Sequence, residues 1–273
     1  MKRILAALTV LVSGTVGASA ADMALKARPP APVAAVYNWT GFYIGGNIGY
    51  GWGQDTNPSV SFVDPGGAVA FGPYFAAGGN VLPNLRPEGV IGGGQVGYNW
   101  QINQFVLGAV ADFQAADIGS SATAIVGPPT VLLTSFQTLS QRLDFLGTVR
   151  GRAGVAFNNV LLYGTGGLAY GRVRNSMTFD APPPAAVFFT GTSSEWRTGW
   201  AAGVGGEYGI GPWSIGLEYL HYDLGRSSVT GLSAPPGLAF PGASLTATQR
   251  TAGDIVRATF NYRFGAGAVV AKY

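Results

Sequence analysis

The sequence predicts an all-β fold: an eight-stranded antiparallel up-and-down transmembrane β-barrel with four long extracellular loops. Three observations lead to this prediction. Apolar side chains alternate with small or polar ones over segments of about ten residues or more, which gives each segment two different faces. Short turns and long connections follow one another alternately along the chain. Charged residues make up only 11% of the chain, too few to cover the outer face of a soluble β-sandwich.

The chain begins with a segment that predicts export. Lys2 and Arg3 precede an apolar run that ends in Ala18-Ser19-Ala20, which is typical of a secretory signal peptide over residues 1–20. We therefore expect cleavage between Ala20 and Ala21. Residues 21–38 are rich in proline and are interpreted as an extended periplasmic leader. The barrel is expected over residues 39–264, followed by a C-terminal extension at residues 265–273.

Eight strands are predicted, because each has bulky apolar side chains at every second position. In chain order, these apolar faces run over Phe42–Trp52, Val90–Trp100, Phe105–Phe113, Leu143–Phe157, Leu162–Tyr170, Trp196–Tyr208, Trp213–Tyr219 and Val256–Phe264. The opposite faces carry glycine, alanine, asparagine and glutamine with sparse charges. The fourth strand is the clearest, since its arginines all fall on one parity, which a helix of period 3.6 would not produce.

The connections between these strands are of two kinds. Short turns are expected at Ile102-Asn103, Asn158-Asn159 and Gly211-Pro212. Long, nearly uncharged loops are expected at Gln54–Arg86, Asp117–Ser140, Asn175–Ser194 and Gly225–Arg250. Apolar residues alternate within Ser59–Ala77 and Ala122–Phe136, so these parts could extend the barrel as hairpins above the membrane. Strict alternation of short and long connections indicates that the short turns share one side of a membrane and the long loops the other.

Charges within the strands fall almost entirely on the parity opposite to the apolar one. If the apolar parity faces lipid, these charges face the lumen, where arginines need carboxylates or water as partners. We therefore predict a network of ion pairs inside the barrel. Its expected members are six arginines and five acidic residues: Asp112, Arg142, Asp144, Arg150, Arg152, Glu195, Arg197, Glu207, Glu218, Arg257 and Arg263.

Aromatic residues gather at the ends of the predicted strands. A transmembrane barrel carries such residues as two girdles at the levels of the lipid headgroups. The expected girdle residues are Trp39, Trp52, Tyr98, Trp100, Trp196, Tyr208, Trp213 and Tyr219. Eight strands enclose an interior that their own side chains fill, which favours a structural barrel over a diffusion pore. Many lumen positions are glycine, however, so a narrow channel stays open as an alternative.

With the strands assigned, the sequence resembles the small outer-membrane barrels of alphaproteobacteria, the porin-family or opacity-type surface antigens. The resemblance covers nearly the whole mature chain. It is carried by the Ala21-Asp22 start, the proline-rich leader, the block from Tyr37 to Asn47 and the closing strand from Val256 to Phe264. It implies an eight-stranded OmpA-like barrel in the outer membrane with a role in envelope integrity and surface properties. Pore activity is often ascribed to this family.

The same resemblance implies partners. Outer-membrane barrels commonly end on an aromatic residue that the barrel assembly machinery reads, and Phe260, Tyr262 and Phe264 fit such a signal. Residues 265–273 follow it, so a second, weaker version ending at Tyr273 is the alternative. The other expected partners are outer-membrane lipid and lipopolysaccharide. A further alternative is a protein that binds an unidentified extracellular ligand, or mediates adhesion, through its loops.

Other classes of function find little support. The chain has no cysteine and a single histidine, which argues against thiol chemistry and against metal sites built from several histidines, and we expect no cofactor. No run of Lys or Arg suggests nucleic acid. Gly92-x-Gly94-x-x-Gly97 has dinucleotide-binding spacing, but a strand continues through it where a helix is needed. His221 lies near Asp223, as in a hydrolase at the barrel rim, yet its parity favours an interfacial histidine, so we expect no enzyme.

Overall fold

The computed structural model describes residues 37–56, 58–63, 82–126, 135–180, 187–233 and 242–265. The predicted signal peptide with its cleavage site at Ala20 and Ala21, the leader as far as residue 36, and residues 266–273 lie outside these ranges. The strands are β1 (Gly41–Gly53), β2 (Ser59–Val63), β3 (Glu88–Ile102), β4 (Phe105–Val126), β5 (Ser135–Phe157), β6 (Val160–Asp180), β7 (Val187–Ile210), β8 (Trp213–Ser233) and β9 (Ser244–Arg263).

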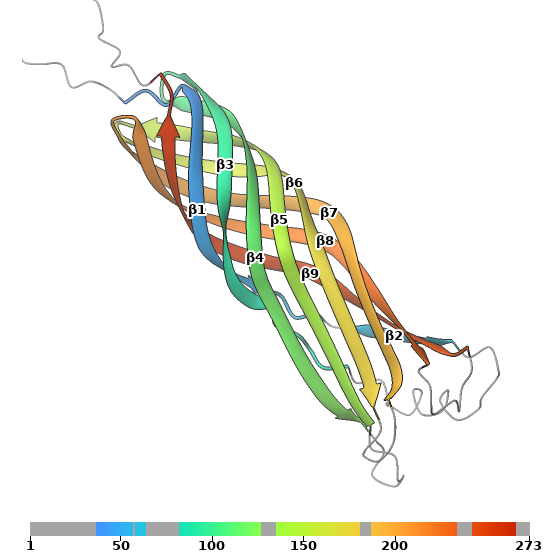
Figure 1. The fold of residues 1–273 in the computed structure, drawn as a ribbon. Helices are drawn as coiled ribbons and strands as arrows, with labels where there is room; N and C mark the ends of the chain where they lie inside the picture. Colours follow the sequence, from blue (N-terminus) through green and yellow to red (C-terminus); the bar gives the residue numbers. More distant parts are fainter. Residues whose placement is uncertain are drawn as a thin grey trace, which may run out of the picture. The chain divides into compact units, whose positions relative to one another are not determined.

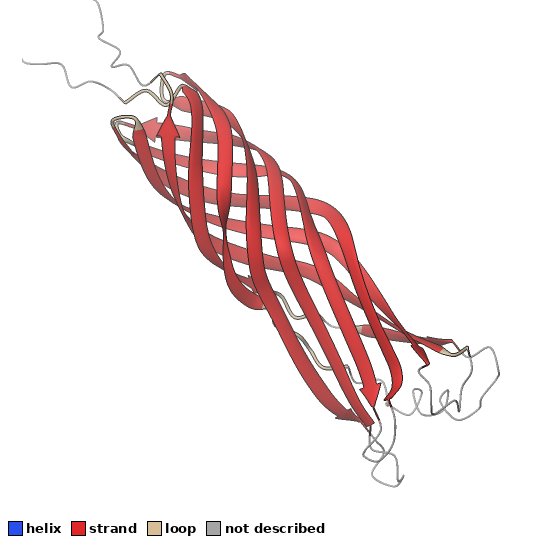
Figure 2. Ribbon diagram, viewed as in Figure 1, coloured by secondary structure: helices blue, strands red, loops and turns tan. Residues whose placement is uncertain are grey.

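Eight of these strands close into a ring. Each strand from β3 to β9 pairs antiparallel with its neighbour in the chain, and β1 pairs with both β3 and β9 (Figures 1 and 2). The closing ladder runs from Tyr43 opposite Arg263 to Gly53 opposite Gly253. Over the length of β1 this closure leaves no unpaired strand edge, which is the requirement for a sheet surrounded by lipid. The predicted up-and-down antiparallel barrel is therefore confirmed.

Tight turns close the β3–β4, β5–β6 and β7–β8 hairpins. Asn103, Asn158 and Gly211 begin these turns with φ values of 55°, 52° and 59°. Asparagine and glycine are the residues that adopt this left-handed conformation at least cost, which explains why the sequence has them here. The predicted positions of these turns agree with the structure to within one residue.

The predicted long loops are wrong in extent, because the strands run on well beyond them. Residues 117–126 belong to β4, 175–180 to β6 and 225–233 to β8, and the partner strands β5, β7 and β9 are extended to match. β2 lies within the first predicted loop and pairs only with the far part of β9, from Ser59 opposite Thr248 to Val63 opposite Ser244. Alternating apolar residues continue through these segments and pack inside the barrel, so the strands extend.

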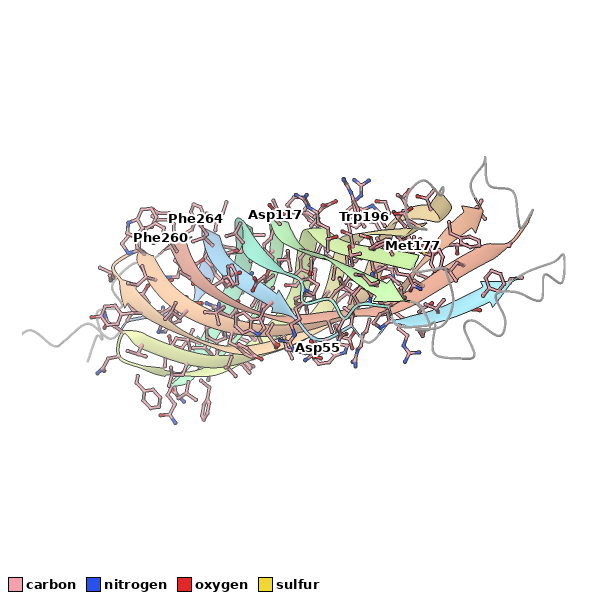
Figure 3. All side chains as sticks on the ribbon, turned by 90° about the horizontal axis from the view of Figure 1, so that it is seen from below. Asp55, Asp117, Met177, Trp196, Phe260 and Phe264 are labelled. Atoms are coloured by element: carbon pink, nitrogen blue, oxygen red, sulfur yellow. The ribbon has the colours of Figure 1, made fainter. Side chains whose placement is uncertain are left out.

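The outside of the barrel is apolar over the part next to the tight turns. Large side chains there stay exposed, including Ile48 at 69%, Phe113 at 65% and Leu217 at 66%. Figure 3 shows Phe260 and Phe264 at the same end, pointing away from the ribbon. Exposed apolar surface on this scale is expected where lipid covers the protein and not where water does. None of the described residues forms a helix long and apolar enough to cross a membrane.

The inside of the barrel is layered. Next to the tight turns, a small apolar cluster contains Tyr37, Trp39, Val106, Leu161 and Tyr163. Charged side chains follow, and beyond them lies an apolar cluster that includes Ile91, Ile118, Leu146, Leu220, Tyr222 and Ile255. Amide and hydroxyl side chains come next, with Gln141 donating to Thr251 and Gln249 to Asn175. A third apolar cluster, including Leu85, Met177, Phe179, Phe189 and Leu245, fills the far end.

Candidate functional site

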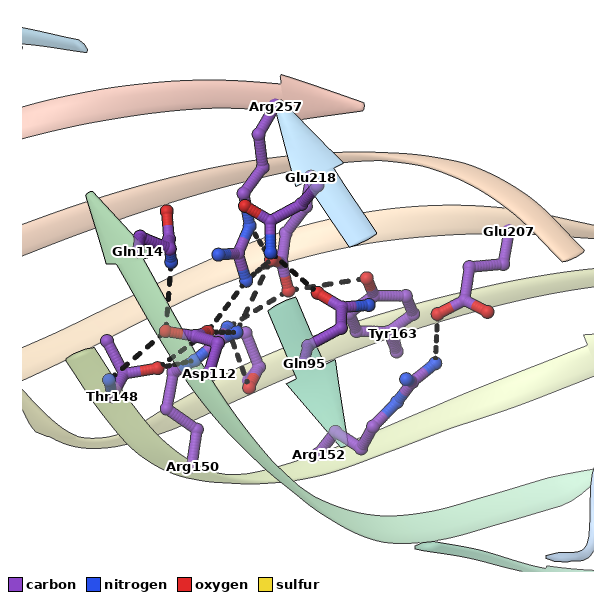
Figure 4. A network of polar contacts seen from close by, with 12 residues as sticks. Gln95, Asp112, Gln114, Thr148, Arg150, Arg152, Tyr163, Glu207, Glu218 and Arg257 are labelled. Carbon is purple, nitrogen blue, oxygen red and sulfur yellow. Dashed lines mark hydrogen bonds and ion pairs between the residues drawn. The ribbon is translucent and has the colours of Figure 1, made fainter. Parts of the chain in front are cut away.

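The centre of the charged layer is a four-residue network, which we call the lumen network: Asp112 on β4, Arg150 on β5, Glu218 on β8 and Arg257 on β9. Arg150 donates to Asp112 and Glu218, both at 2.9 Å. Arg257 donates through Nη2 to Asp112 at 3.0 Å and through Nε to Glu218 at 2.7 Å. The side chains of all four residues are at most 4% exposed. Figure 4 shows how these contacts reach across the lumen.

The lumen network is balanced in charge. Two guanidinium groups face two carboxylates, and each carboxylate contacts both arginines. Thr148 adds a hydroxyl donor to Asp112 at 2.8 Å. Isolated buried charges cost several kcal/mol each, whereas a paired and hydrogen-bonded set recovers much of that cost. The network therefore ties four strands of the ring together at one level.

A second pair lies nearer the tight turns. Arg152 donates to Glu207 at 2.7 Å and to the Tyr43 hydroxyl at 3.0 Å. Its guanidinium carbon lies 4.0 Å from the centroid of the Tyr163 ring, close enough for a cation–π contact. Ser214 donates to the other oxygen of Glu207 at 3.0 Å. This level joins β1, β5, β6, β7 and β8.

Arg263 sits closest to the end of the barrel and has no carboxylate within ion-pair distance among the described residues. Its guanidinium carbon lies 4.2 Å from the Tyr37 ring centroid and 6.0 Å from that of Trp39. Tyr37 donates to the backbone oxygen of Trp213 at 3.1 Å. The segment before β1 thus folds into the barrel end, although the sequence assigned Tyr37 to the extended leader.

Strand parity explains why seven charged side chains point into the lumen. Asp112, Arg150, Arg152, Glu207, Glu218, Arg257 and Arg263 all occupy inward positions of regular strands. Ladder register then sets adjacent partners side by side, as with Glu218 directly opposite Arg257. Partners two or more strands apart are brought together by ring closure.

The other four predicted lumen charges do not join the lumen network, and for Arg142 and Asp144 the predicted inward position is wrong. The Arg142 side chain is 55% exposed and contacts Asp117 and Asp144 on the outside. A register shift between Leu143 and Phe145 in the β5–β6 ladder reverses the parity there, so Leu143 turns inward in its place. Sequence periodicity carries no sign of such a bulge.

Glu195 and Arg197 keep the inward parity but do not join the lumen network. They contact each other at 3.5 Å and remain 43% and 33% exposed. The register of the β7–β8 ladder shifts between Thr190 and Trp200, although Ser193 still donates to the backbone oxygen of Ser228 at 3.0 Å. With these exposed fractions the pair is solvated instead of enclosed.

Most predicted girdle residues point outward. Trp52, Tyr98, Trp100, Trp196, Tyr208, Trp213 and Tyr219 are all among the exposed large side chains. Trp39 is the exception, with 2% exposure, and its place in a girdle is a wrong prediction. Trp39 precedes β1, where strand alternation does not hold, and its ring packs on Tyr37 at 4.7 Å.

The predicted assembly signal also lies on the outside. Phe260 stacks on Trp213 with centroids 4.8 Å apart, and Tyr262 contacts the same ring. Phe264 follows β9 and is 54% exposed. These aromatic residues line the outer face of the closing strand next to the tight-turn end.

His221 lies on the outer face of β8. Its Nδ1 is 2.8 Å from Asp254, which also accepts from the Tyr219 hydroxyl at 2.6 Å. The predicted neighbour Asp223 pairs instead with Arg250. Across the described ranges, no hydrogen bond joins His221 to a serine or threonine hydroxyl. No cluster of potential metal ligands occurs among those residues either.

The sequence reasoning missed the neutral members of the interior. Asn47 donates to Gln95, and Gln95 donates to Asn261, forming a short chain of amides between β1, β3 and β9. All three side chains are buried. Their inward parity is visible in the sequence, but neutral side chains carry no charge pattern that marks them as members of a network.

Comparisons with known proteins agree with this architecture. The family model described as "Outer membrane protein beta-barrel domain" matches residues 8–264. The 31 kDa outer-membrane immunogenic protein of Brucella melitensis is 36% identical over 235 residues, which covers 84% of this chain and 90% of that protein. The 25 kDa outer-membrane immunogenic protein of Brucella abortus is 25% identical over 233 residues, covering 84% and 87%.

Among solved structures, the outer membrane protein OprG from Pseudomonas aeruginosa aligns with a TM-score of 0.42 at 11% identity, covering 83% of this chain and 98% of OprG. The family assignment rests on the sequence matches. Together with the closed ring and its apolar outside, they give the protein its place: the chain belongs to the outer membrane protein beta-barrel domain family and is an integral outer-membrane protein with a role at the cell surface.

Proposed function

We propose that this protein is a closed structural barrel in the outer membrane, that the far parts of its long strands are exposed at the cell surface, and that it does not conduct solutes. The observation that carries this proposal is the lumen network. Its four side chains link β4 and β5 to β8 and β9 across the interior, at most 4% exposed. An eight-stranded barrel has an interior about wide enough for its own side chains, so such a crossing leaves little room for solute.

Two further layers support closure. The apolar cluster around Leu146, Leu220 and Ile255 lies beyond the lumen network, and each of these side chains is at most 1% exposed. On the other side, Trp39 and Tyr37 fill the barrel end. A hydrated ion crossing the barrel has to pass both apolar layers as well as the charges, and an apolar constriction opposes the entry of water and ions.

Single-channel recording in planar bilayers tests this proposal. Full-length protein whose folded state is verified by gel mobility is expected to give the same current as a protein-free bilayer. Discrete conductance steps that disappear after heat unfolding would show that the narrow-channel alternative is correct. The variant Glu195→Gln is recorded as a control, because that carboxylate lies outside the lumen network.

We also propose that the protein is not an enzyme. The supporting observation is the surroundings of His221, where Asp254 and Tyr219 are present but no serine or threonine hydroxyl is hydrogen-bonded among the described residues. A hydrolytic triad needs a nucleophile in contact with the base. Cells that express His221→Ala are therefore expected to have the same lipid A acylation as cells with the unchanged protein.

Assembly is the remaining part of the proposal. Phe260, Tyr262 and Phe264 lie along the outside of the strand that closes the ring, where another protein could contact them before closure. We infer that they form the segment read by the barrel assembly machinery.

A further inference from the structure

Three arginines project from one part of the outer wall. Arg142 on β5 and Arg172 and Arg174 on β6 are all exposed, and we call them the β5–β6 arginine patch. Arg142 and Arg174 are direct cross-strand partners. Like charges placed directly opposite each other on a sheet repel, so this arrangement needs anions nearby.

The protein supplies only part of that negative charge. Asp144 lies between Arg142 and Arg174 and contacts the Nε atom of each, while Asp117 contacts Nη2 of Arg142 at 3.0 Å. Arg172 donates through Nε to the Ser194 hydroxyl at 3.1 Å. Two carboxylates thus face three guanidinium groups, and one positive charge is left without a protein counterpart among the described residues.

The way these arginines are held leaves their outer ends available. Arg172 and Arg174 are each fixed through Nε, and their terminal nitrogens have no hydrogen-bond partner among the described residues. The terminal nitrogens of a guanidinium group form the fork that binds phosphate or carboxylate with two parallel hydrogen bonds. The patch is therefore oriented to receive an anion from outside the barrel.

An aromatic cluster lies directly beside the patch. Phe145 contacts Phe113 at 4.1 Å, Trp196 at 5.5 Å and Tyr170 at 6.1 Å between ring centroids. Phe145 and Trp196 are the two ladder neighbours of Arg172. Figure 3 shows Asp117 and Trp196 on the same side of the barrel, both pointing outward. Aromatic rings next to cationic groups are typical of the boundary between acyl chains and headgroups.

The position along the strand agrees with that boundary. On β6 the outward residues run from Val160, at the tight turn, to Tyr170, a span of eleven residues. A tilted transmembrane strand needs about 9–11 residues to cross the hydrocarbon layer. Arg172 is the next outward residue, so it lies at headgroup level on the side away from the tight turns, which is the outer leaflet.

We infer that the β5–β6 arginine patch is a binding site for the anionic headgroup of lipopolysaccharide, the lipid of that leaflet. The guanidinium forks hold the acidic group, and the rings of Phe145, Trp196 and Tyr170 pack against the acyl chains below it. The site is on the outside of the barrel, so it is independent of whether the lumen conducts.

The test measures binding of lipid A that carries two phosphates, mixed into phosphatidylcholine nanodiscs, to the folded full-length protein by native mass spectrometry. The triple variant Arg142→Gln, Arg172→Gln, Arg174→Gln is compared with Arg86→Gln. Arg86 is a suitable control because it is an exposed arginine that is paired with one carboxylate, Asp55, and lies away from the aromatic cluster. Heat-dependent gel mobility shows that each variant is folded.

We expect the triple variant to bind this lipid A at least about tenfold more weakly than the unchanged protein, since it loses several charge-assisted hydrogen bonds. Arg86→Gln is expected to bind it as the unchanged protein does. Dephosphorylated lipid A is expected to bind the unchanged protein as weakly as the triple variant binds the phosphorylated form, and added inorganic phosphate is expected not to compete. Equal binding by the triple variant, or equal loss in Arg86→Gln, would overturn the inference. Competition by free phosphate would mean that the patch binds small anions and not the lipid.

Discussion

Like Asp112, Glu218 contacts two buried arginines at once, which makes it a sensitive residue of the lumen network. Replacing it by leucine leaves Arg150 and Arg257 with only Asp112 as an anionic partner. Breaking a buried ion pair by removing one partner costs about 3–5 kcal/mol. We expect Glu218→Leu to lower the free energy of unfolding, measured by urea titration in micelles, by about that amount.

A double variant and a control make this prediction specific. Glu218→Leu with Arg257→Met leaves one balanced pair, Asp112 and Arg150, so its loss should be smaller than the sum of the two single losses. Glu195→Gln removes a partly exposed partner, and exposed pairs contribute about 1 kcal/mol or less. A loss for Glu195→Gln as large as that for Glu218→Leu would contradict the assignment.

Two adjacent glycines on β3 offer a second test at the level of single residues. A Cβ atom at Gly93 would lie 2.0 Å from the backbone oxygen of Phe113, whereas at Gly94 the nearest atom is 3.8 Å away. Gly93→Ala therefore forces neighbouring backbone apart, and overpacking of this kind costs about 1–3 kcal/mol. Gly94→Ala is expected to leave the urea midpoint unchanged. Equal midpoints for the two variants would show that the β3–β4 ladder adjusts.

At the scale of the strand, the tight turns and the alternation of faces were predictable because both depend on local residue types. The bulge near Asp144 was not, since an extra residue in one strand is compensated only by the register of its partners. The register shift in the β7–β8 ladder is of the same kind. For this reason the alternation predicts the interior positions of Arg150 and Arg152 correctly, but not the outer positions of Arg142 and Asp144.

The segment before β1 leads to a further prediction about an element. Trp39 is buried against Tyr37, Val106 and Leu161, and its backbone N–H donates to the side chain of Gln101 at 2.7 Å. Truncation of a buried tryptophan costs about 3–5 kcal/mol. Trp39→Ala is expected to lose stability on that scale in urea titrations. Trp100→Ala, which removes an outward ring at 56% exposure, should lose clearly less. The reverse order would mean that the segment is not packed inside the barrel.

At the scale of the whole molecule, the sequence indicated ring closure only indirectly, through the even number of strands and the alternation of connections. Contacts such as Arg152 with Glu207 and Tyr43 join residues far apart in the chain, and only the closed ring brings them together. Sequence periodicity shows which side chains of a strand point inward, but not at which level along the barrel axis each of them lies. For that reason the charges could be grouped as a set before their partners could be named.

Closure also determines how the chain tolerates truncation. β9 pairs with β8 along one edge and with β1 along the other, so a chain that ends before Ser244 leaves both edges open. Each unpaired backbone group in lipid costs several kcal/mol, which the remaining strands cannot offset. We expect such a chain to show no heat-dependent shift in gel mobility, whereas a chain ending at Phe264 retains the whole ladder and should show the shift of the full-length protein.

The chain that ends at Phe264 also tests the assembly signal in cells. If Phe260, Tyr262 and Phe264 are the recognised residues, the chain ending at Phe264 reaches the outer membrane in normal amounts. If it folds in detergent but fails to reach the membrane, the signal lies in residues 265–273.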